Sequence, residues 1–138
     1  MIKLTYGQMD SEVFWQAIGV LTSSVDMPIS TALNMIEIHK ALGAERETAS
    51  VIIGKITDKY SEKDGNGKPK LIEEDVDGVT RHRVPVIEGM REEYAKDMKE
   101  FFDTEFTIGM SPLKVSDLEG VKMTPQMVHS LRALIVAD

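Results

Sequence analysis

A glycine-rich turn at residues 64–67, Asp-Gly-Asn-Gly, is the part of the chain whose residue spacing comes nearest to a metal site. Oxygen side chains at alternate positions are typical of the opening of a calcium-binding loop. The pattern then fails, because Lys68 takes the next ligand position, Pro69 replaces the glycine of the sharp turn, and Asp75 stands where a bidentate glutamate is needed. The residues therefore predict a turn that ends a helix, and no calcium site.

Other residue types with metal-binding or nucleophilic chemistry are scattered. His39, His82 and His129 fall on three different predicted elements, without a partner at zinc-hydrolase spacing. The absence of cysteine excludes thiolate metal sites and thiol nucleophiles. We find no Gly-x-Ser-x-Gly elbow, no phosphate-binding glycine loop and no dinucleotide fingerprint. We expect a protein that is not an enzyme, with no catalytic or metal-binding residues and no cofactor.

Adjacent carboxylates are the remaining groups with acid–base chemistry. Glu73 with Glu74, and Glu92 with Glu93, could act as a general acid and base only if a cleft enclosed them. Their polar neighbours predict exposure instead. A hydrolase or nuclease with a carboxylate metal site is accordingly the third of three functional hypotheses.

The length and charge of the chain limit its number of domains and the kinds of partner it can bind. Its 138 residues fit a single domain, 1–138, and 16 basic against 23 acidic side chains give a net charge of −7. The negative net charge repels the phosphate backbone of nucleic acids, so we expect no direct binding of nucleic acid. The chain has no basic leader and no apolar run of about 18 residues, which predicts a cytosolic protein without a membrane anchor.

Helical periodicity dominates the first half of the chain. A strand at residues 1–6 is expected to end at Gly7, and a helix begins near Ser11. A long helix is predicted over residues 28–62, broken at Gly43 in the alternative interpretation. At about 1.5 Å per residue, this helix would be longer than one domain of this size needs, so part of it could pair with another chain. Its expected apolar stripe comprises Ile29, Leu33, Ile36, Leu42, Ala49, Ile52, Ile53, Ile56 and Tyr60.

The second half predicts a hairpin and shorter elements. Strands at 70–74 and 79–86 flank the tight-turn dipeptide Asp77-Gly78, within an exposed, protruding hairpin at residues 68–87. A helix over 88–102, a strand over 105–108 and a capped turn at 116–120 follow. The last helix begins at Thr124 and carries inward-facing residues as far as Ile135. The fold class expected is α+β, mainly helical, with one long helix, a β-hairpin and short strands.

Two charged groups are the candidate partner-binding residues. Alternation along a strand places Arg81 and Arg83 on one face of the hairpin, where they could bind an acidic partner or protect an edge strand from aggregation. The helix over 88–102 has an acidic face, which is either a solvated surface or a binding surface. The acidic candidates on it are Glu92, Glu93, Asp97 and Glu100.

The order of these features resembles small proteins encoded by tailed bacteriophages and prophages. The resemblance rests on Pro28-Ile29 at the start of the long helix, the segments 59–67 (KYSEKDGNG) and 100–106 (EFFDTEF), and residues 116–131 from SDLEG onward. It covers most of the chain, although the insertion at 75–85 is longer than expected for that group. The resemblance implies a phage structural or accessory product located in the host cytoplasm or the virion, and it transfers no catalytic residues.

Two functional hypotheses lead. The first is a non-enzymatic phage protein that acts through protein–protein contacts, as a minor virion component or assembly factor present in several copies. Its partners would be phage structural or host proteins, and copies of itself. The alternative is an acidic host-directed inhibitor whose carboxylates occupy a basic, nucleic-acid-binding groove of a host protein.

Overall fold

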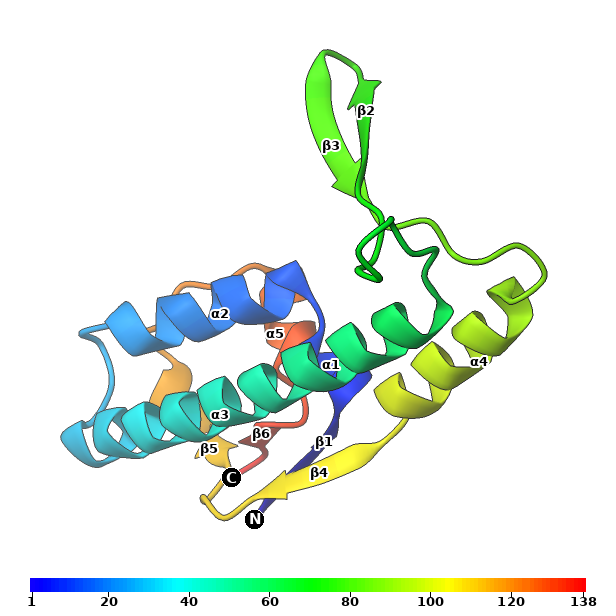
Figure 1. Cartoon of the computed structure of the whole chain (residues 1–138). Coiled ribbons are helices and arrows are strands. Elements are labelled where there is room, and N and C mark those ends of the chain that lie inside the picture. The colour runs from blue at the N-terminus through cyan, green and yellow to red at the C-terminus, as the bar shows by residue number, and fades with distance from the viewer. The chain divides into compact units, whose positions relative to one another are not determined.

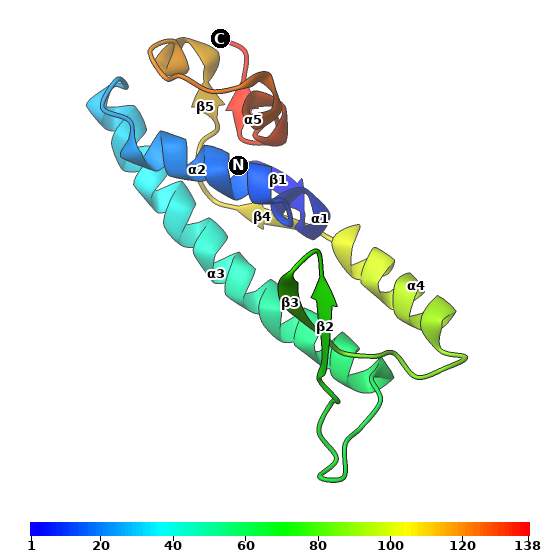
Figure 2. The same cartoon turned by 90° about the horizontal axis from the view of Figure 1, so that it is seen from above.

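The computed structural model describes all 138 residues and confirms the predicted α+β, mainly helical fold (Figures 1 and 2). The helices are α1 (Tyr6–Met9), α2 (Glu12–Ser23), α3 (Ile29–Tyr60), α4 (Arg91–Phe102), α5 (Pro125–Ser130) and the 3₁₀ turn η1 (Val115–Leu118). The strands are β1 (Ile2–Thr5), β2 (Ile72–Val76), β3 (Val79–Arg83), β4 (Glu105–Ile108), β5 (Leu113–Lys114) and β6 (Ile135–Val136). They form three two-stranded sheets, β1 with β4, β2 with β3, and β5 with β6.

The chain forms two compact units, which we describe separately. Unit 1 comprises Met1–Glu47 and Phe101–Asp138, and unit 2 comprises Thr48–Glu100. Both α3 and α4 contribute residues to each unit. The prediction of one domain over residues 1–138 with a protruding hairpin at 68–87 concerns the arrangement of these units, and it stays a prediction.

The sheet of unit 1 buries one face, as alternation along its strands predicts. β1 and β4 are antiparallel, with Ile2 opposite Ile108 and Leu4 opposite Phe106. These four side chains are buried, whereas Lys3 points to solvent and forms an ion pair with Glu105 at 2.9 Å. The sheet thus supplies one wall of the unit 1 core.

A short helix follows β1 where the sequence predicts the end of a strand. Thr5 and Gln8 form a capping box, in which the Gln8 N–H donates to Thr5 Oγ1 at 3.1 Å and the Thr5 N–H donates to Gln8 Oε1 at 2.8 Å. Tyr6 therefore begins α1 instead of ending β1, and Gly7 lies inside the helix. The two side chains satisfy backbone donors that would otherwise be unpaired at the start of the helix.

Tyr6 is the centre of an aromatic cluster in unit 1. Its ring stacks on Phe101 with centroids 4.7 Å apart and lies 4.6 Å from the ring of Phe106. Its hydroxyl donates to Glu45 Oε2 at 2.7 Å, and its backbone N–H donates to the carbonyl of Thr104 at 3.1 Å. Burial of the ring, together with the hydrogen bond to Glu45, raises the pKa of Tyr6 from 10.0 to about 12.

Two antiparallel helices complete most of the unit 1 core. The side chain of Ser11 caps α2, and the buried face of that helix carries Phe14, Ala17, Ile18 and Leu21, as predicted. Figures 1 and 2 both show α2 beside the first half of α3, running in the opposite direction. The buried residues of this half of α3 are Thr31, Met35, Ile38 and Leu42.

The long helix is continuous, but its expected apolar stripe is wrong in the first turns. α3 has 32 residues and passes through Gly43 without a break. Ile29, Leu33 and Ile36, which the sequence places in the same stripe as Leu42, are 81%, 61% and 45% exposed, whereas Leu42 is buried. The interval from Ile36 to buried Leu42 turns a helix by about 600°, so these two residues cannot share one face. The prediction joined two different faces into one stripe.

The C-terminal segment contains a strand pair that the sequence does not predict. β5 and β6 are parallel, with Leu113 opposite Ile135, so the last helix ends at Ser130 and does not reach Ile135. Leu131 and Leu134 are buried in the turns between α5 and β6. α5 also packs against α2, which joins this segment to the helical layer of unit 1.

Unit 2 has little core of its own. Its only buried side chains are Ala49, Tyr60, Ser61 and Pro85. After α3, residues 60–64 form backbone hydrogen bonds to both ends of the hairpin, including Glu62 N–H to the Pro85 carbonyl and Lys70 N–H to the Glu62 carbonyl. The hairpin is thus attached by its base to the end of α3.

The close approach of α1 to Phe102 gives a prediction about stability. A Cβ at Gly7 would lie 2.9 Å from the Phe102 carbonyl oxygen, so we expect Gly7→Ala to lower the free energy of unfolding by about 1–3 kcal/mol. Gly19→Ala in α2 is the matched control. It meets no heavy atom within 4 Å and should stabilise the protein by about 0.5–1 kcal/mol. Urea denaturation measures both, and equal stability of the Gly7→Ala variant and the original chain would contradict the close approach.

The raised pKa of Tyr6 gives a pH dependence. Because the folded state holds the neutral phenol, this group stabilises the fold fully below pH 10.0, and the contribution is lost as the pH rises toward about 12. Tyr6→Phe should lower the free energy of unfolding by about 1 kcal/mol at neutral pH and remove this part of the alkaline decline. Tyr94→Phe, which leaves the hydrogen bond to Glu45 in place, is the control. Tyrosinate absorbance and urea denaturation over the same pH interval test the assignment.

Candidate protein-interaction site

Three apolar side chains in the first half of α3 are exposed and share one face of the helix. Ile29, Leu33 and Ile36, hereafter the apolar row, are spaced at i, i+4 and i+7 and are all exposed. Each lies two residues before a buried position of the same helix, and two residues correspond to a rotation of about 200°. The first half of α3 therefore has two apolar faces on opposite sides, of which the chain covers one.

The apolar row has defined ends. Val25, four residues before Ile29 in the chain, is 91% exposed. After Ile36, the next residues of the helix include Glu37 and Lys40, which form an exposed ion pair at 3.4 Å. The apolar row therefore ends at a charged pair. A short apolar strip with a charged boundary is typical of a surface that another molecule covers.

The hairpin places the predicted basic residues as strand alternation requires. β2 and β3 pair with Glu74 opposite Arg81 and Ile72 opposite Arg83, so the two arginines share one face. Arg83 Nε donates to Glu74 Oε1 at 2.5 Å. His82 lies on the other face, with its Nδ1 3.8 Å from Glu73 Oε1. Arg81 and Arg83 are exposed, and Arg83 is already paired within the hairpin.

A charged hollow of about 640 Å³ at the base of the hairpin brings two of the predicted residues together. Arg83 from β3 and Glu92 from α4 both line it. Its other charged lining residues are Glu62, Glu88 and Arg91. Three carboxylates and two guanidinium groups line the hollow, so it presents no uniform charge to a ligand. No group of three or more histidine, aspartate or glutamate side chains is placed to hold a metal ion.

The predicted acidic residues of α4 do not form one free surface. Asp97 Oδ2 accepts a hydrogen bond from the Tyr60 hydroxyl at 2.6 Å and lies 3.6 Å from Lys59 Nζ. The Tyr60 hydroxyl, and then the charge of Lys59, hold the pKa of Asp97 below its ordinary value. Glu92 and Glu93 are exposed, and Glu100 is exposed at the end of unit 2. Asp97 therefore joins α4 to the end of α3.

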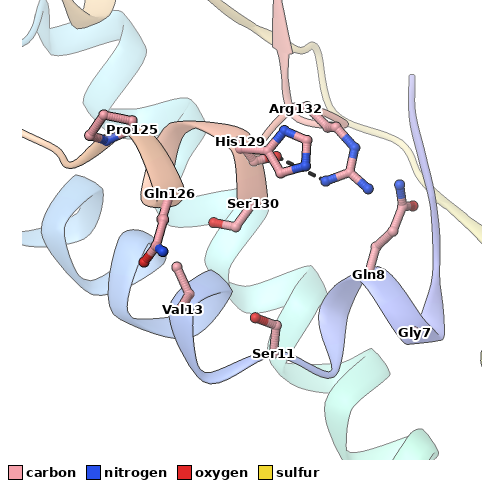
Figure 3. A pocket seen from close by; sticks show the side chains of 9 residues that line it. All are labelled: Gly7, Gln8, Ser11, Val13, Pro125, Gln126, His129, Ser130 and Arg132. Carbon is pink, nitrogen blue, oxygen red and sulfur yellow. Dashed lines mark hydrogen bonds between the residues drawn. The ribbon is translucent and has the colours of Figure 1, made fainter.

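A second hollow, of about 590 Å³, lies in unit 1 between α1, the start of α2 and α5 (Figure 3). Several of its polar groups already serve the local backbone: Ser11 caps α2, Gln8 caps α1, and Ser130 Oγ donates to the Met127 carbonyl at 2.6 Å. Figure 3 shows Arg132 directed toward His129, whose carbonyl accepts from Arg132 Nη1 at 3.0 Å. Four of its polar side chains, those of Gln8, Ser11, Ser130 and Arg132, are therefore already hydrogen-bonded to nearby backbone groups.

Sequence reasoning combined the apolar row with the buried face of the same helix, and it missed Asp97 as a structural residue. The spacing of Ile29, Leu33 and Ile36 was visible, and a rotation count against Met35 and Ile38 could have separated the two faces. The bond from Tyr60 to Asp97 joins residues 37 positions apart, and no local pattern indicates it.

No helix combines the length and the apolar composition that crossing a membrane requires.

The bond between Tyr60 and Asp97 gives a prediction at acidic pH. Because the folded state lowers the pKa of Asp97 from 3.8, its contribution to stability is complete above that pH and is lost as the pH falls further. Tyr60→Phe should raise the Asp97 pKa toward its ordinary value, which carboxyl-detected NMR titration measures. Tyr94→Phe is the control, because its ring packs edge-on against Tyr60 at 6.0 Å and the hydroxyl of Tyr60 stays in place. An unchanged Asp97 titration in the Tyr60→Phe variant would contradict this assignment.

Comparison with known proteins assigns no family to this arrangement. No protein-family model matches the sequence, and no curated protein or solved structure matches the chain.

Proposed function

We propose that the protein acts through protein–protein contacts and not through catalysis, as a minor virion component or an assembly factor of a tailed bacteriophage. The observation that carries this proposal is the apolar row on α3. The likeness in the order of caps, turns and stripes to small phage proteins supports the phage context, with the host cytoplasm and the virion as its locations.

The apolar row supports a binding role on energetic grounds. Ile29, Leu33 and Ile36 remain exposed although the opposite face of the same helix is buried. Full burial of one such side chain contributes about 1.5–3 kcal/mol, so a partner that covers the row gains several kcal/mol from a few contacts. The partner we propose is a phage structural protein with a complementary apolar surface, such as an amphipathic helix.

The inhibitor hypothesis has less support from the same residues. An acidic surface that imitates nucleic acid needs carboxylates free to pair with a basic groove. Asp97 is engaged by Tyr60 and Lys59, and Lys96 lies among the acidic positions of α4. We therefore favour contact through the apolar row.

Photo-crosslinking tests the proposed function. A crosslinking amino acid at Leu33, in cells producing the phage that encodes the chain, should capture a phage structural protein, and the adduct is identified by mass spectrometry. Leu33→Glu combined with Ile36→Glu should weaken binding of the captured partner by about 100-fold or more, because it removes two apolar contacts and introduces charge. Stability should change by only about 0.5 kcal/mol, since both positions are exposed.

Val51→Glu is the matched control for this experiment. Val51 lies on the same helix and is 57% exposed, close to the 61% of Leu33, but it is outside the apolar row. An equal loss of binding in this control, or a chain that crosslinks to nothing and is absent from purified particles, would overturn the proposal.

A further inference from the structure

The hairpin of β2 and β3 exposes almost all of its side chains. Of the ten residues in its strands, Ile72 is half-buried and all the others are exposed. An isolated two-stranded hairpin is at most marginally stable in water, and hairpins in folded proteins are stabilised by further strands or a packed face. The sheet contains only these two strands, so each strand has one edge whose backbone groups are unpaired.

The turn fixes which backbone groups point outward. Asp77 and Gly78 have φ values of 52° and 78°, as in the two-residue turn that matches the twist of a hairpin. In such a turn Val76 and Val79 exchange hydrogen bonds, and bonded pairs alternate with non-bonded pairs along the strands. The non-bonded pairs are Asp75 with Thr80 and Glu73 with His82, whose N–H and C=O groups therefore face the open edges.

The two open edges carry opposite charges. β2 contains Glu73, Glu74 and Asp75 and no basic residue. β3 contains Arg81, His82 and Arg83 and no acidic residue. The edges are therefore complementary to each other, and neither is complementary to itself.

We propose that the hairpin is a self-assembly element, in which the β3 edge of one copy of the chain pairs with the β2 edge of the next copy. The proposal goes beyond the contact made by the apolar row and rests on different residues. An antiparallel register equivalent to the one inside the hairpin places Thr80 of one copy opposite Asp75 of the next, and Arg81 opposite Glu74. The outward backbone groups of both edges are then paired, and each acidic strand lies between two basic strands.

Charge disfavours the symmetric alternatives. Pairing of two β2 edges would set three carboxylates against three carboxylates, and pairing of two β3 edges would set arginines against arginines. Like charges directly opposite each other destabilise a strand pair. The contact is therefore head-to-tail, and such contacts repeat to give a ring when the rotation closes and a filament when it does not.

A proline substitution at the open edge is the first test. Thr80→Pro removes an outward N–H and leaves the hydrogen bonds inside the hairpin intact, whereas Thr80→Val keeps the N–H. Both variants lose the hydrogen bond from the Thr80 hydroxyl to Asp75. A comparison of the two variants therefore tests the backbone N–H of residue 80. Sedimentation velocity should show the original chain and Thr80→Val forming species larger than the 15.4 kDa monomer at high concentration and low salt. Thr80→Pro should need about tenfold more protein or remain monomeric.

Charge reversal is the second test. Arg81→Glu with Arg83→Glu makes both edges acidic, and Glu73→Lys with Glu74→Lys makes both edges mostly basic. Each variant alone should be monomeric, and an equimolar mixture should assemble, because each acidic edge then meets a basic edge of the other variant. NMR contacts between Val76 and Val79 report whether the hairpin is formed in every sample.

Several outcomes would overturn the proposal. These are a chain that stays monomeric up to millimolar concentration at low salt, a Thr80→Pro variant that assembles as Thr80→Val does, and a mixture of charge variants that stays monomeric while both hairpins are formed. The Leu33→Glu, Ile36→Glu variant separates this proposal from the function of the apolar row, because it should assemble as the original chain does.

Discussion

The fold of unit 1 depends on the contacts of one residue, Tyr6. Its ring lies against Phe101 and Phe106, its hydroxyl donates to Glu45, and its backbone N–H donates to the Thr104 carbonyl. These contacts bring together the N-terminal strand, the middle of α3 and the junction of α4 with β4. The ring is packed and the hydroxyl is hydrogen-bonded in the same position. Tyr6 therefore fixes where the chain lies as it leaves β1 and in which direction it continues.

Rules that concern neighbouring residues predicted most helices and strands, but they missed the shortest elements. The Asp77-Gly78 turn, the Ser11 cap and the alternation in β1 and β4 are properties of neighbouring residues, and the structure confirms them. The helix at Tyr6 was missed because four residues show no periodicity, although the Thr5 and Gln8 capping pair was present in the sequence. The β5 and β6 pair was missed because its partners are 22 residues apart and each has two residues.

The candidate site was only partly predictable, for a similar reason. Strand alternation correctly placed Arg81 and Arg83 on one face, because that geometry is local. Composition alone treated Asp97 as one more surface carboxylate, whereas its environment depends on Tyr60 at the far end of a long helix. The apolar row was visible as a pattern, but a helix with two apolar faces requires the positions of α2 and the sheet to show which face is covered.

The two surfaces differ in the forces that would act on them. The apolar row consists of aliphatic side chains, so contact there depends on the removal of apolar area from water and is nearly independent of salt. The hairpin edges combine backbone hydrogen bonding with opposite charges, so contact there weakens as salt rises and depends on the sign of each strand. The two proposed contacts use different residues, Ile29, Leu33 and Ile36 in one and the strands of the hairpin in the other. Because unit 2 buries only Ala49, Tyr60, Ser61 and Pro85, assembly through the hairpin would also add order to the part of the chain with the least core of its own.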